Sequence, residues 1–138
     1  MDRLLEGLKI LLVEEEVLIA MDVEQLCYDL GAAAVATISS DAYLTSEALD
    51  TREEVRTALL GADAAILDAK VGGDWTLELA RRLKQRRVPF VFATGYPGTE
   101  PLFAEFPDVP VIGKPYSGLE LPQAVARMVA LTRSGEGG

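Results

Sequence analysis

Short apolar runs alternate along the chain with segments whose apolar residues recur at helical spacing. Five runs predict strands, at residues 8–13, 33–37, 64–67, 88–93 and 109–112. Continuous apolar runs of this length, bounded by polar or turn-forming residues, are typical of strands that are buried on both faces. Strand and helix patterns alternate about five times. This order predicts an α/β fold, with a doubly wound five-stranded parallel sheet and helices on both faces.

The helical segments are read from their apolar spacing and their end signals. The first carries Ile19, Val23, Leu26 and Leu30 on one face, and Gly31 is the expected C-terminal cap. Three further helices are expected after residues 51–54, after Asp74, which could cap its helix, and from about Pro122. Residues 39–50 predict a loop or a broken helix, residues 71–74 a turn, residues 95–98 a loop, and the residues that follow, up to Phe106, a short helix.

Length and composition are those of one folded domain. The chain has 138 residues, of which 49% are apolar and 25% charged, so a sizeable core can form. We assign residues 1–133 to the domain and residues 134–138 to a flexible tail. The net charge of −9 repels the phosphates of nucleic acids and of anionic membranes, so neither is expected as a partner.

Histidine is absent and Cys27 is the single cysteine. Histidine metal ligands, Ser-His catalysis and an intrachain disulfide are therefore excluded, and a reducing compartment is favoured. Cys27 lies on the apolar face of the first predicted helix and is expected to be an unreactive core residue. The chain has no apolar run of transmembrane length and no signal-peptide pattern, so we expect a cytoplasmic protein.

Polar side chains follow the predicted strands at the point where each strand ends. These residues are Glu14 and Glu15 after the first run, then Asp68, Thr94 and Lys114 after three later runs. The carboxyl ends of parallel strands meet at one edge of a sheet, which is where ligands bind in this class of fold. The sequence therefore predicts that three carboxylates, a hydroxyl and an ammonium group gather there.

The charge of this predicted cluster indicates a cation site. Three crowded carboxylates repel one another, and Lys114 neutralises only one of them. Mg²⁺ prefers oxygen ligands and commonly takes a few carboxylates together with a phosphate oxygen. A carboxylate beside Mg²⁺ and a lysine can attack phosphorus and form an aspartyl phosphate, with the charge of the transferred group held by Mg²⁺, Lys114 and the Thr94 hydroxyl.

Four motifs in this order give the chain a specific resemblance to the response-regulator receiver family, over roughly residues 8–133. They are Leu11-Leu12-Val13-Glu14-Glu15-Glu16, Ile66-Leu67-Asp68, Phe92-Ala93-Thr94-Gly95-Tyr96 and Lys114-Pro115-Tyr116. The third motif also resembles the FAT GUY subgroup of single-domain regulators. The resemblance implies a flavodoxin-like (βα)₅ fold and a stand-alone response regulator.

The same resemblance implies a role for each matching residue. Asp68 would be the phospho-acceptor, Thr94 the switch hydroxyl and Lys114 the phosphate ligand. Glu14, Glu15, Asp68 and the backbone carbonyl of Lys70 would bind Mg²⁺, and the Lys114-Pro115 bond would be cis. A histidine kinase would donate the phosphoryl group, and a downstream protein of unknown identity would receive the signal. Beyond this self-catalysed phosphotransfer and its own dephosphorylation, no enzymatic activity is expected.

Three departures from the family pattern leave an alternative open. Glu15 stands where aspartate is usual, Lys70 where a neutral polar residue is common, and Val111 where the switch aromatic usually lies. Tyr96 or Tyr116 could replace that aromatic. The alternative is a degenerate receiver that binds a protein partner without taking up phosphate.

The residues of the predicted site also have simpler interpretations, and two other folds are alternatives to a receiver. The three glutamates could open a helix in solvent, Asp68 could cap a helix or turn, Thr94 could bond a turn, and Lys114 could be a surface residue. A haloacid-dehalogenase-like phosphatase would need an Asp-x-Asp-x-Thr motif after its first strand, and a flavodoxin-like flavin carrier a phosphate loop rich in Ser, Thr and Gly. Residues 14–16 provide neither motif.

Overall fold

The computed structural model describes residues 3–71, 74–95, 101–114 and 119–135. The predictions that concern Tyr96, Tyr116 and the Lys114-Pro115 bond lie outside these residues. Across the described ranges, no helix is both long and apolar enough to cross a bilayer.

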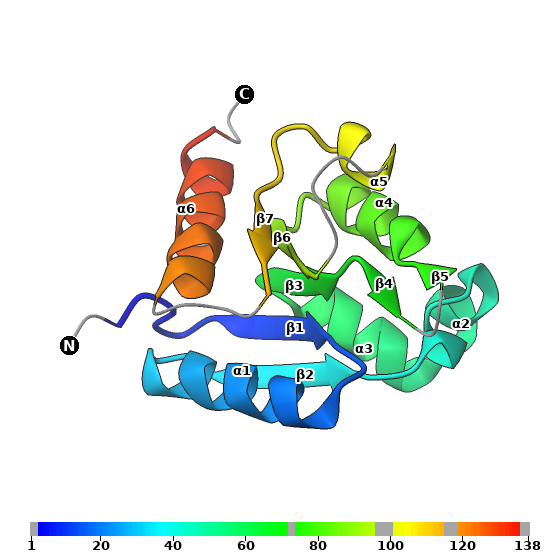
Figure 1. Cartoon of the computed structure of the whole chain (residues 1–138), viewed down its shortest axis with the longest axis horizontal. Coiled ribbons are helices and arrows are strands. Elements are labelled where there is room, and N and C mark those ends of the chain that lie inside the picture. Colours follow the sequence, from blue (N-terminus) through cyan, green and yellow to red (C-terminus); the bar gives the residue numbers. More distant parts are fainter. Residues whose placement is uncertain (1–2, 72–73, 96–100, 115–118, 136–138) are drawn as a thin grey trace.

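The centre of the fold is a five-stranded sheet in the order β2-β1-β3-β6-β7, with all neighbouring strands parallel (Figure 1). Its strands are β1 (Lys9–Val13), β2 (Ala34–Ile38), β3 (Ala64–Asp68), β6 (Phe90–Thr94) and β7 (Val111–Gly113). All five correspond to predicted apolar runs, and the predicted α/β parallel sheet is confirmed. The two central strands β3 and β6 are buried along their whole length, which explains their continuous apolar character.

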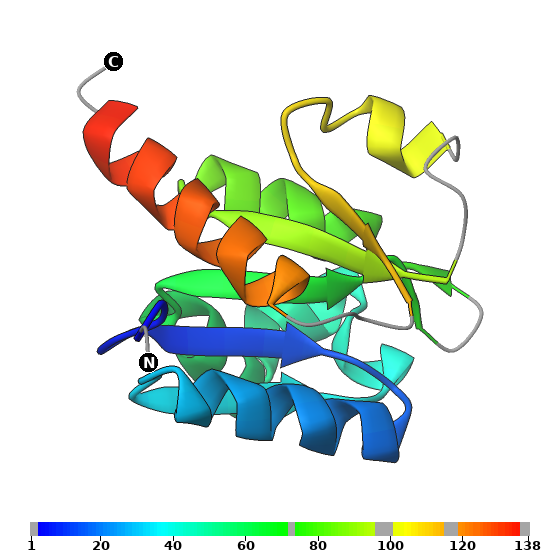
Figure 2. The same ribbon diagram turned by 60° about the vertical axis from the view of Figure 1, so that its left-hand side comes forward.

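Helices cover both faces of this sheet (Figure 2). The helices α1 (Val17–Asp29) and α6 (Glu120–Gly135) pack on one face, around a core that includes Ile10 and Leu12 of β1. The helices α3 (Glu53–Gly61) and α4 (Leu77–Gln85) pack on the other face, around a core that includes Leu11 and Val13. Alternate residues of β1 therefore serve opposite cores, as expected for a doubly wound sheet.

Gly31 ends α1 as predicted. Its φ of +98° lies in the left-handed region, which glycine adopts without a steric cost. The Gly31 N–H donates to the carbonyl of Tyr28 at 3.0 Å, and the Ala32 N–H donates to the carbonyl of Cys27 at 3.0 Å. These two bonds form a Schellman motif, which satisfies carbonyls that the helix itself leaves unpaired.

Residues 39–50 form short helices rather than a loop. A 3₁₀ turn, η1 (Asp41–Tyr43), precedes α2 (Ser46–Thr51), and the chain is extended at Arg52 before α3 begins. The broken-helix interpretation is therefore the correct one. The Thr45 hydroxyl caps α2 by accepting the Ala48 N–H at 3.1 Å.

The segment after β3 also differs from expectation. A small antiparallel pair, β4 (Lys70–Val71) with β5 (Asp74–Trp75), stands where only a turn was predicted. Asp74 is part of β5, so its predicted role as the cap of α4 was wrong, and Thr76 occupies that position. The last helix, α6, continues to Gly135, two residues into the predicted tail.

The remaining helix is the short α5 (Pro101–Ala104), within the range predicted for it. Phe103 of α5 packs edge-to-face on Phe92 of β6, with ring centroids 5.2 Å apart. Phe106, just beyond α5, makes similar contacts with Phe90 and Phe92, at 5.7 and 5.9 Å. Aromatic packing thus holds this four-residue helix, which could not persist on helical propensity alone.

Candidate functional site at the carboxyl edge of the sheet

Four of the predicted side chains occupy the carboxyl ends of four strands. Asp68 and Thr94 are the last residues of β3 and β6, and Glu14 and Lys114 directly follow β1 and β7. Glu14, Asp68 and Thr94 are almost completely buried, at 1%, 6% and 0% exposure. Buried polar groups require partners, so their presence at one edge marks a built polar site.

Lys114 is the link between the two buried carboxylates. Its Nζ lies 2.7 Å from Oε1 of Glu14 and 3.0 Å from Oδ2 of Asp68, and the more exposed Glu16 is 3.9 Å away. The Lys114 backbone N–H also donates to the carbonyl of Thr94 at 2.9 Å. The lysine is therefore anchored to β6 by its backbone, while its side chain bridges β1 and β3.

The ionisation of Asp68 and Lys114 reflects this arrangement. Burial raises the pKa of the Asp68 carboxyl above its ordinary value, and nearby Glu14 acts in the same direction, while the hydrogen bond from Lys114 opposes them. Burial lowers the pKa of Lys114, but the hydrogen bonds to Glu14 and Asp68 outweigh it and leave the pKa raised. Lys114 therefore stays charged at neutral pH, and additional positive charge would favour the ionised form of Asp68.

Backbone groups complete the surroundings of the two carboxylates. The Glu16 N–H donates to Oε2 of Glu14 at 3.0 Å, and the Lys70 N–H makes a long contact of 3.4 Å with Oδ1 of Asp68. Each carboxylate thus has one oxygen beside Lys114 and the other beside a backbone amide. Oδ1 of Asp68, which makes the longer and weaker contact, is therefore held less tightly than Oδ2.

Thr76 is a member of the site that sequence reasoning did not identify. It is 2% exposed, and its hydroxyl donates to the carbonyl of Asp68 at 2.9 Å, with a longer contact of 3.3 Å to the carbonyl of Ala69. The Thr76 N–H donates to the Ala69 carbonyl at 2.9 Å as well. Thr76 therefore ties the end of the β4–β5 pair to the backbone of Asp68. The one sequence signal for this role of Thr76 is its position directly before the helical pattern of α4.

The predicted Mg²⁺ ligands fit the ion in part. Glu14 and Asp68 supply two buried carboxylates, and Mg²⁺ commonly binds through one or two carboxylates, with water or phosphate at its other positions. Glu15 is exposed, and within the described ranges no three acidic, histidine or cysteine side chains lie close enough together to hold a metal ion. Glu14 and Asp68 are thus the two buried carboxylates of the predicted set, and Glu15 is exposed in this structure.

Two departures from the family pattern are also placed by the structure. Val111 lies in β7, half-buried, and packs against the core on the α3–α4 side of the sheet. Lys70 is the first residue of β4 and is half-buried, two positions beyond Asp68. Val111 thus packs against the core, and Lys70 places a second lysine in the short strand that follows Asp68.

No protein-family model matches the sequence, and no curated protein is similar to it in sequence. The structure, by contrast, is similar to solved receiver domains. A response regulator receiver protein from Sinorhizobium medicae is 24% identical, with a TM-score of 0.73 over 93% of this chain and 98% of that one. A receiver domain from Clostridium thermocellum is 18% identical, with a TM-score of 0.65 over 94% and 97%.

A third similar structure is the receiver domain of a sensor histidine kinase from Pseudomonas aeruginosa, described with a magnesium ion in its active site cleft. It is 20% identical, with a TM-score of 0.68 over 90% of this chain and 98% of that one. These similarities extend over nearly the whole of each chain, and the strand order β2-β1-β3-β6-β7 accompanies them here. The chain therefore has the fold of the response regulator receiver domains.

Proposed function

We propose that this protein is a response regulator receiver that accepts a phosphoryl group on Asp68 and transmits the signal by binding another protein. The observation that carries the proposal is the buried Asp68 carboxylate at the end of β3, held 3.0 Å from Nζ of Lys114 and sharing that lysine with Glu14. A buried carboxylate with a perturbed pKa beside a cation at the ligand-binding edge of such a sheet is typical of a functional site.

In the proposed reaction a carboxylate oxygen of Asp68 attacks the phosphorus of a phosphohistidine on a histidine kinase. The new O–P bond forms as the P–N bond breaks, and the imidazole nitrogen leaves with the electron pair and takes up a proton. Oδ1 is the better candidate for the attack, because Oδ2 lies 3.0 Å from Nζ of Lys114, whereas the contact of Oδ1 with the Lys70 N–H is longer, at 3.4 Å. Lys114 stabilises the charge on the transferred group, and Thr94 lies at the neighbouring strand end.

Mg²⁺ is part of the proposal, with Glu14 and Asp68 as its protein carboxylates. When bound, it would offset their negative charge and that of the phosphoryl oxygens. Lys114 now occupies the position between these two carboxylates, so we expect its ammonium to move from Glu14 toward the phosphoryl group when the site is loaded. The same Lys114 bridge also supports the alternative of a phosphate-independent binding module, because it already neutralises part of the charge of both carboxylates without an ion.

The test is the intact mass of the protein after incubation with phosphoramidate, with and without Mg²⁺. We expect one added phosphoryl group in the wild type that requires Mg²⁺ and is lost in Asp68→Asn. The matched control is Asp22→Asn, which makes the same change at an exposed residue of α1. If Mg²⁺ binds, as followed by titration, but neither phosphoramidate nor any tested histidine kinase phosphorylates the chain, the phosphate-independent alternative is supported.

A further inference from the structure

An apolar groove lies at the end of the sheet opposite the acidic site. It has a volume of about 530 Å³, within the range of small-molecule sites, and is bordered by the C-terminal end of α4, the start of β6, the segment before β7 and the end of α6. Its floor includes Phe90, the first residue of β6, whereas Thr94 at the other end of that strand belongs to the acidic site. The two sites are therefore separated by roughly 13 Å along the strand.

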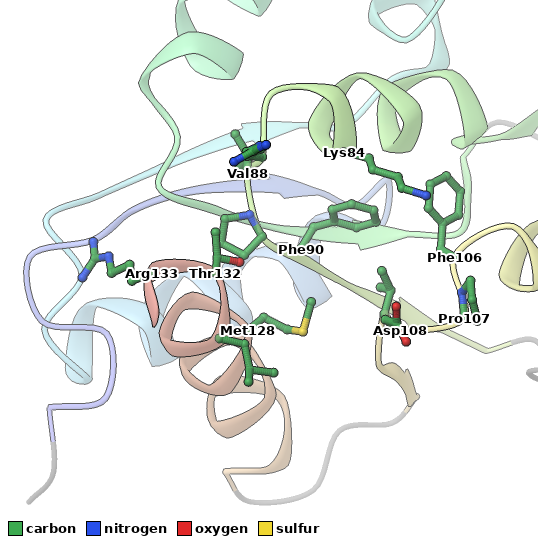
Figure 3. Close-up of a pocket in the computed structure, with 13 residues that line it drawn as sticks. Lys84, Val88, Phe90, Phe106, Pro107, Asp108, Met128, Thr132 and Arg133 are labelled. Carbon is green, nitrogen blue, oxygen red and sulfur yellow. The ribbon is translucent and has the colours of Figure 1, made fainter. Parts of the chain in front are cut away.

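The walls of the groove come from rigid elements. Phe106 and Phe90 are buried and in edge-to-face contact, and Met128 lies on the facing side of α6 (Figure 3). The Pro89 carbonyl accepts the Ala65 N–H at 3.0 Å, which fixes the start of β6 to the neighbouring strand. The groove is thus preformed, with an apolar interior that a bound apolar group could fill without rearrangement.

Positive charge surrounds the groove although the chain carries a net charge of −9. Lys84, Arg87 and Arg133 line it against one lining acid, Asp108, and the adjoining hollow adds Arg86 and Asp63. In the part of the chain that the structure describes, no ion pair involves any of these four cations. The preceding arginines of α4, Arg81 and Arg82, are by contrast both paired with carboxylates.

The backbone conformation of Arg87 is a second, independent indication that this groove has a function. It follows α4 with a φ of +60°, the only positive φ of a non-glycine residue in the described ranges. Its N–H donates to the Lys84 carbonyl and the Val88 N–H donates to the Leu83 carbonyl, which is the Schellman motif that α1 forms with Gly31. Glycine avoids the steric cost of this conformation, whereas most L-residues carry it, so the arginine stands here against the local backbone preference.

We infer that this groove is a second binding site, which takes a small amphipathic carboxylate. The apolar body of the ligand would lie on Phe90, Phe106 and Met128, and its carboxylate would be bound by Arg87 and Arg133 at the rim. Charge complementarity favours an anion over a neutral or cationic apolar molecule, and a volume of about 530 Å³ matches a small ligand rather than a protein segment. The site is independent of Asp68 and of the proposed phosphorylation.

The experiment is an amide NMR titration of the full chain with sodium decanoate, with 1-naphthoate as an aromatic carboxylate and decanol as a neutral analogue. We expect saturable shifts at the amides of Val88, Thr132 and Arg133 with one or both carboxylates, and binding by decanol at least about tenfold weaker, because a charged hydrogen bond contributes that much affinity. Shifts confined to the exposed apolar residues of α1, or equal affinity for decanol, would overturn the inference.

Two variants test the cations, and a third is the control. Arg87→Gly and Arg133→Gln should each weaken carboxylate binding by about tenfold. Arg87→Gly should also keep or raise the melting temperature, because glycine tolerates the left-handed conformation. Arg127→Gln removes the same charge from an exposed position six residues earlier on α6, outside the groove, and should bind as the wild type does. Unchanged affinity in both rim variants, or binding of an acidic peptide but of neither carboxylate, would contradict the assignment.

Discussion

Lys114 and Asp68 form an ion pair at 3.0 Å between residues 46 positions apart in the sequence, and neither side chain is more than 14% exposed. The same ammonium reaches Glu14 at 2.7 Å, so one lysine serves two buried carboxylates. Removing the lysine charge from such a cluster costs more than the pair itself contributes, because both carboxylates then stay buried without a cation beside them.

We therefore predict that Lys114→Met destabilises the protein by on the order of 3 kcal/mol in urea unfolding at neutral pH. Adding Asp68→Asn to this variant should recover part of the loss, because it removes one of the two unpaired charges. Lys9→Met is the matched control at an exposed position, with an expected change of about 0.5 kcal/mol or less. Equal losses in the two single variants would show that the Lys114 bridge is not a stabilising element.

Thr76 should stabilise the β4–β5 pair, which follows Asp68. Thr76→Val keeps the shape of the side chain but removes the donor to the Asp68 carbonyl, so we expect a loss of about 1 to 3 kcal/mol. Thr76→Ser retains the hydroxyl and should restore most of the stability. Thr57→Val, at an exposed position of α3, measures the effect of the substitution alone. A Thr76→Ser variant as unstable as Thr76→Val would assign the effect to the methyl group rather than to the hydrogen bond.

The sequence predicted the sheet and the edge at which the site forms because each strand is an apolar run that stops abruptly. It could not determine which of the three glutamates after β1 turns inward. In a half-exposed strand the alternation of polar and apolar residues would decide this, but β1 packs on cores at both faces and carries no such alternation. Glu14 is buried, whereas Glu15 and Glu16 are exposed.

Other features depend on contacts between distant segments and leave little local signal. Thr76 binds the carbonyl of Asp68 eight positions earlier, across the β4–β5 pair. Arg87 adopts a conformation for which sequence rules predict glycine or asparagine. The groove beside it joins α4, β6 and α6, which are separated along the chain, so no single motif could have indicated it.

Cys27 should be unreactive in the native state. It is 2% exposed, and burial, with a smaller contribution from nearby Glu24, raises the pKa of its thiol from 9.0 to about 12. We expect the thiol to react with a chromogenic disulfide reagent only after unfolding in urea.

The same shift links Cys27 to stability at alkaline pH. The folded thiol stays protonated where the unfolded thiol ionises, so the thiol stabilises the fold below pH 9.0, and this contribution is lost as the pH rises toward about 12. The wild type should therefore lose stability relative to Cys27→Ala across this range. A pH-independent difference, or rapid labelling of the native thiol, would contradict the prediction.

Arg82 joins α4 to α2. Its guanidinium donates to Glu78 on its own helix at 3.0 Å, to Asp50 of α2, and to the Ser46 hydroxyl at 3.2 Å. The hydrogen bond from Arg82 holds the pKa of Asp50 below its ordinary value of 3.8. A depressed carboxyl pKa stabilises the fold above the unfolded pKa, and that stability is lost as the pH falls through the folded value.

We expect Arg82→Met to lower the urea midpoint at neutral pH, and the difference from the wild type to shrink as the pH falls below 3.8. Arg81→Met is the matched control on the next residue. Its guanidinium binds Glu105 in a bidentate pair, but at 48% exposure it is more open to solvent than Arg82 at 17%, so a smaller loss at neutral pH is expected. If Arg82→Met loses the same stability at neutral pH as it does below pH 3.8, the loss comes from packing of the arginine side chain on α4 and not from the ionised Asp50.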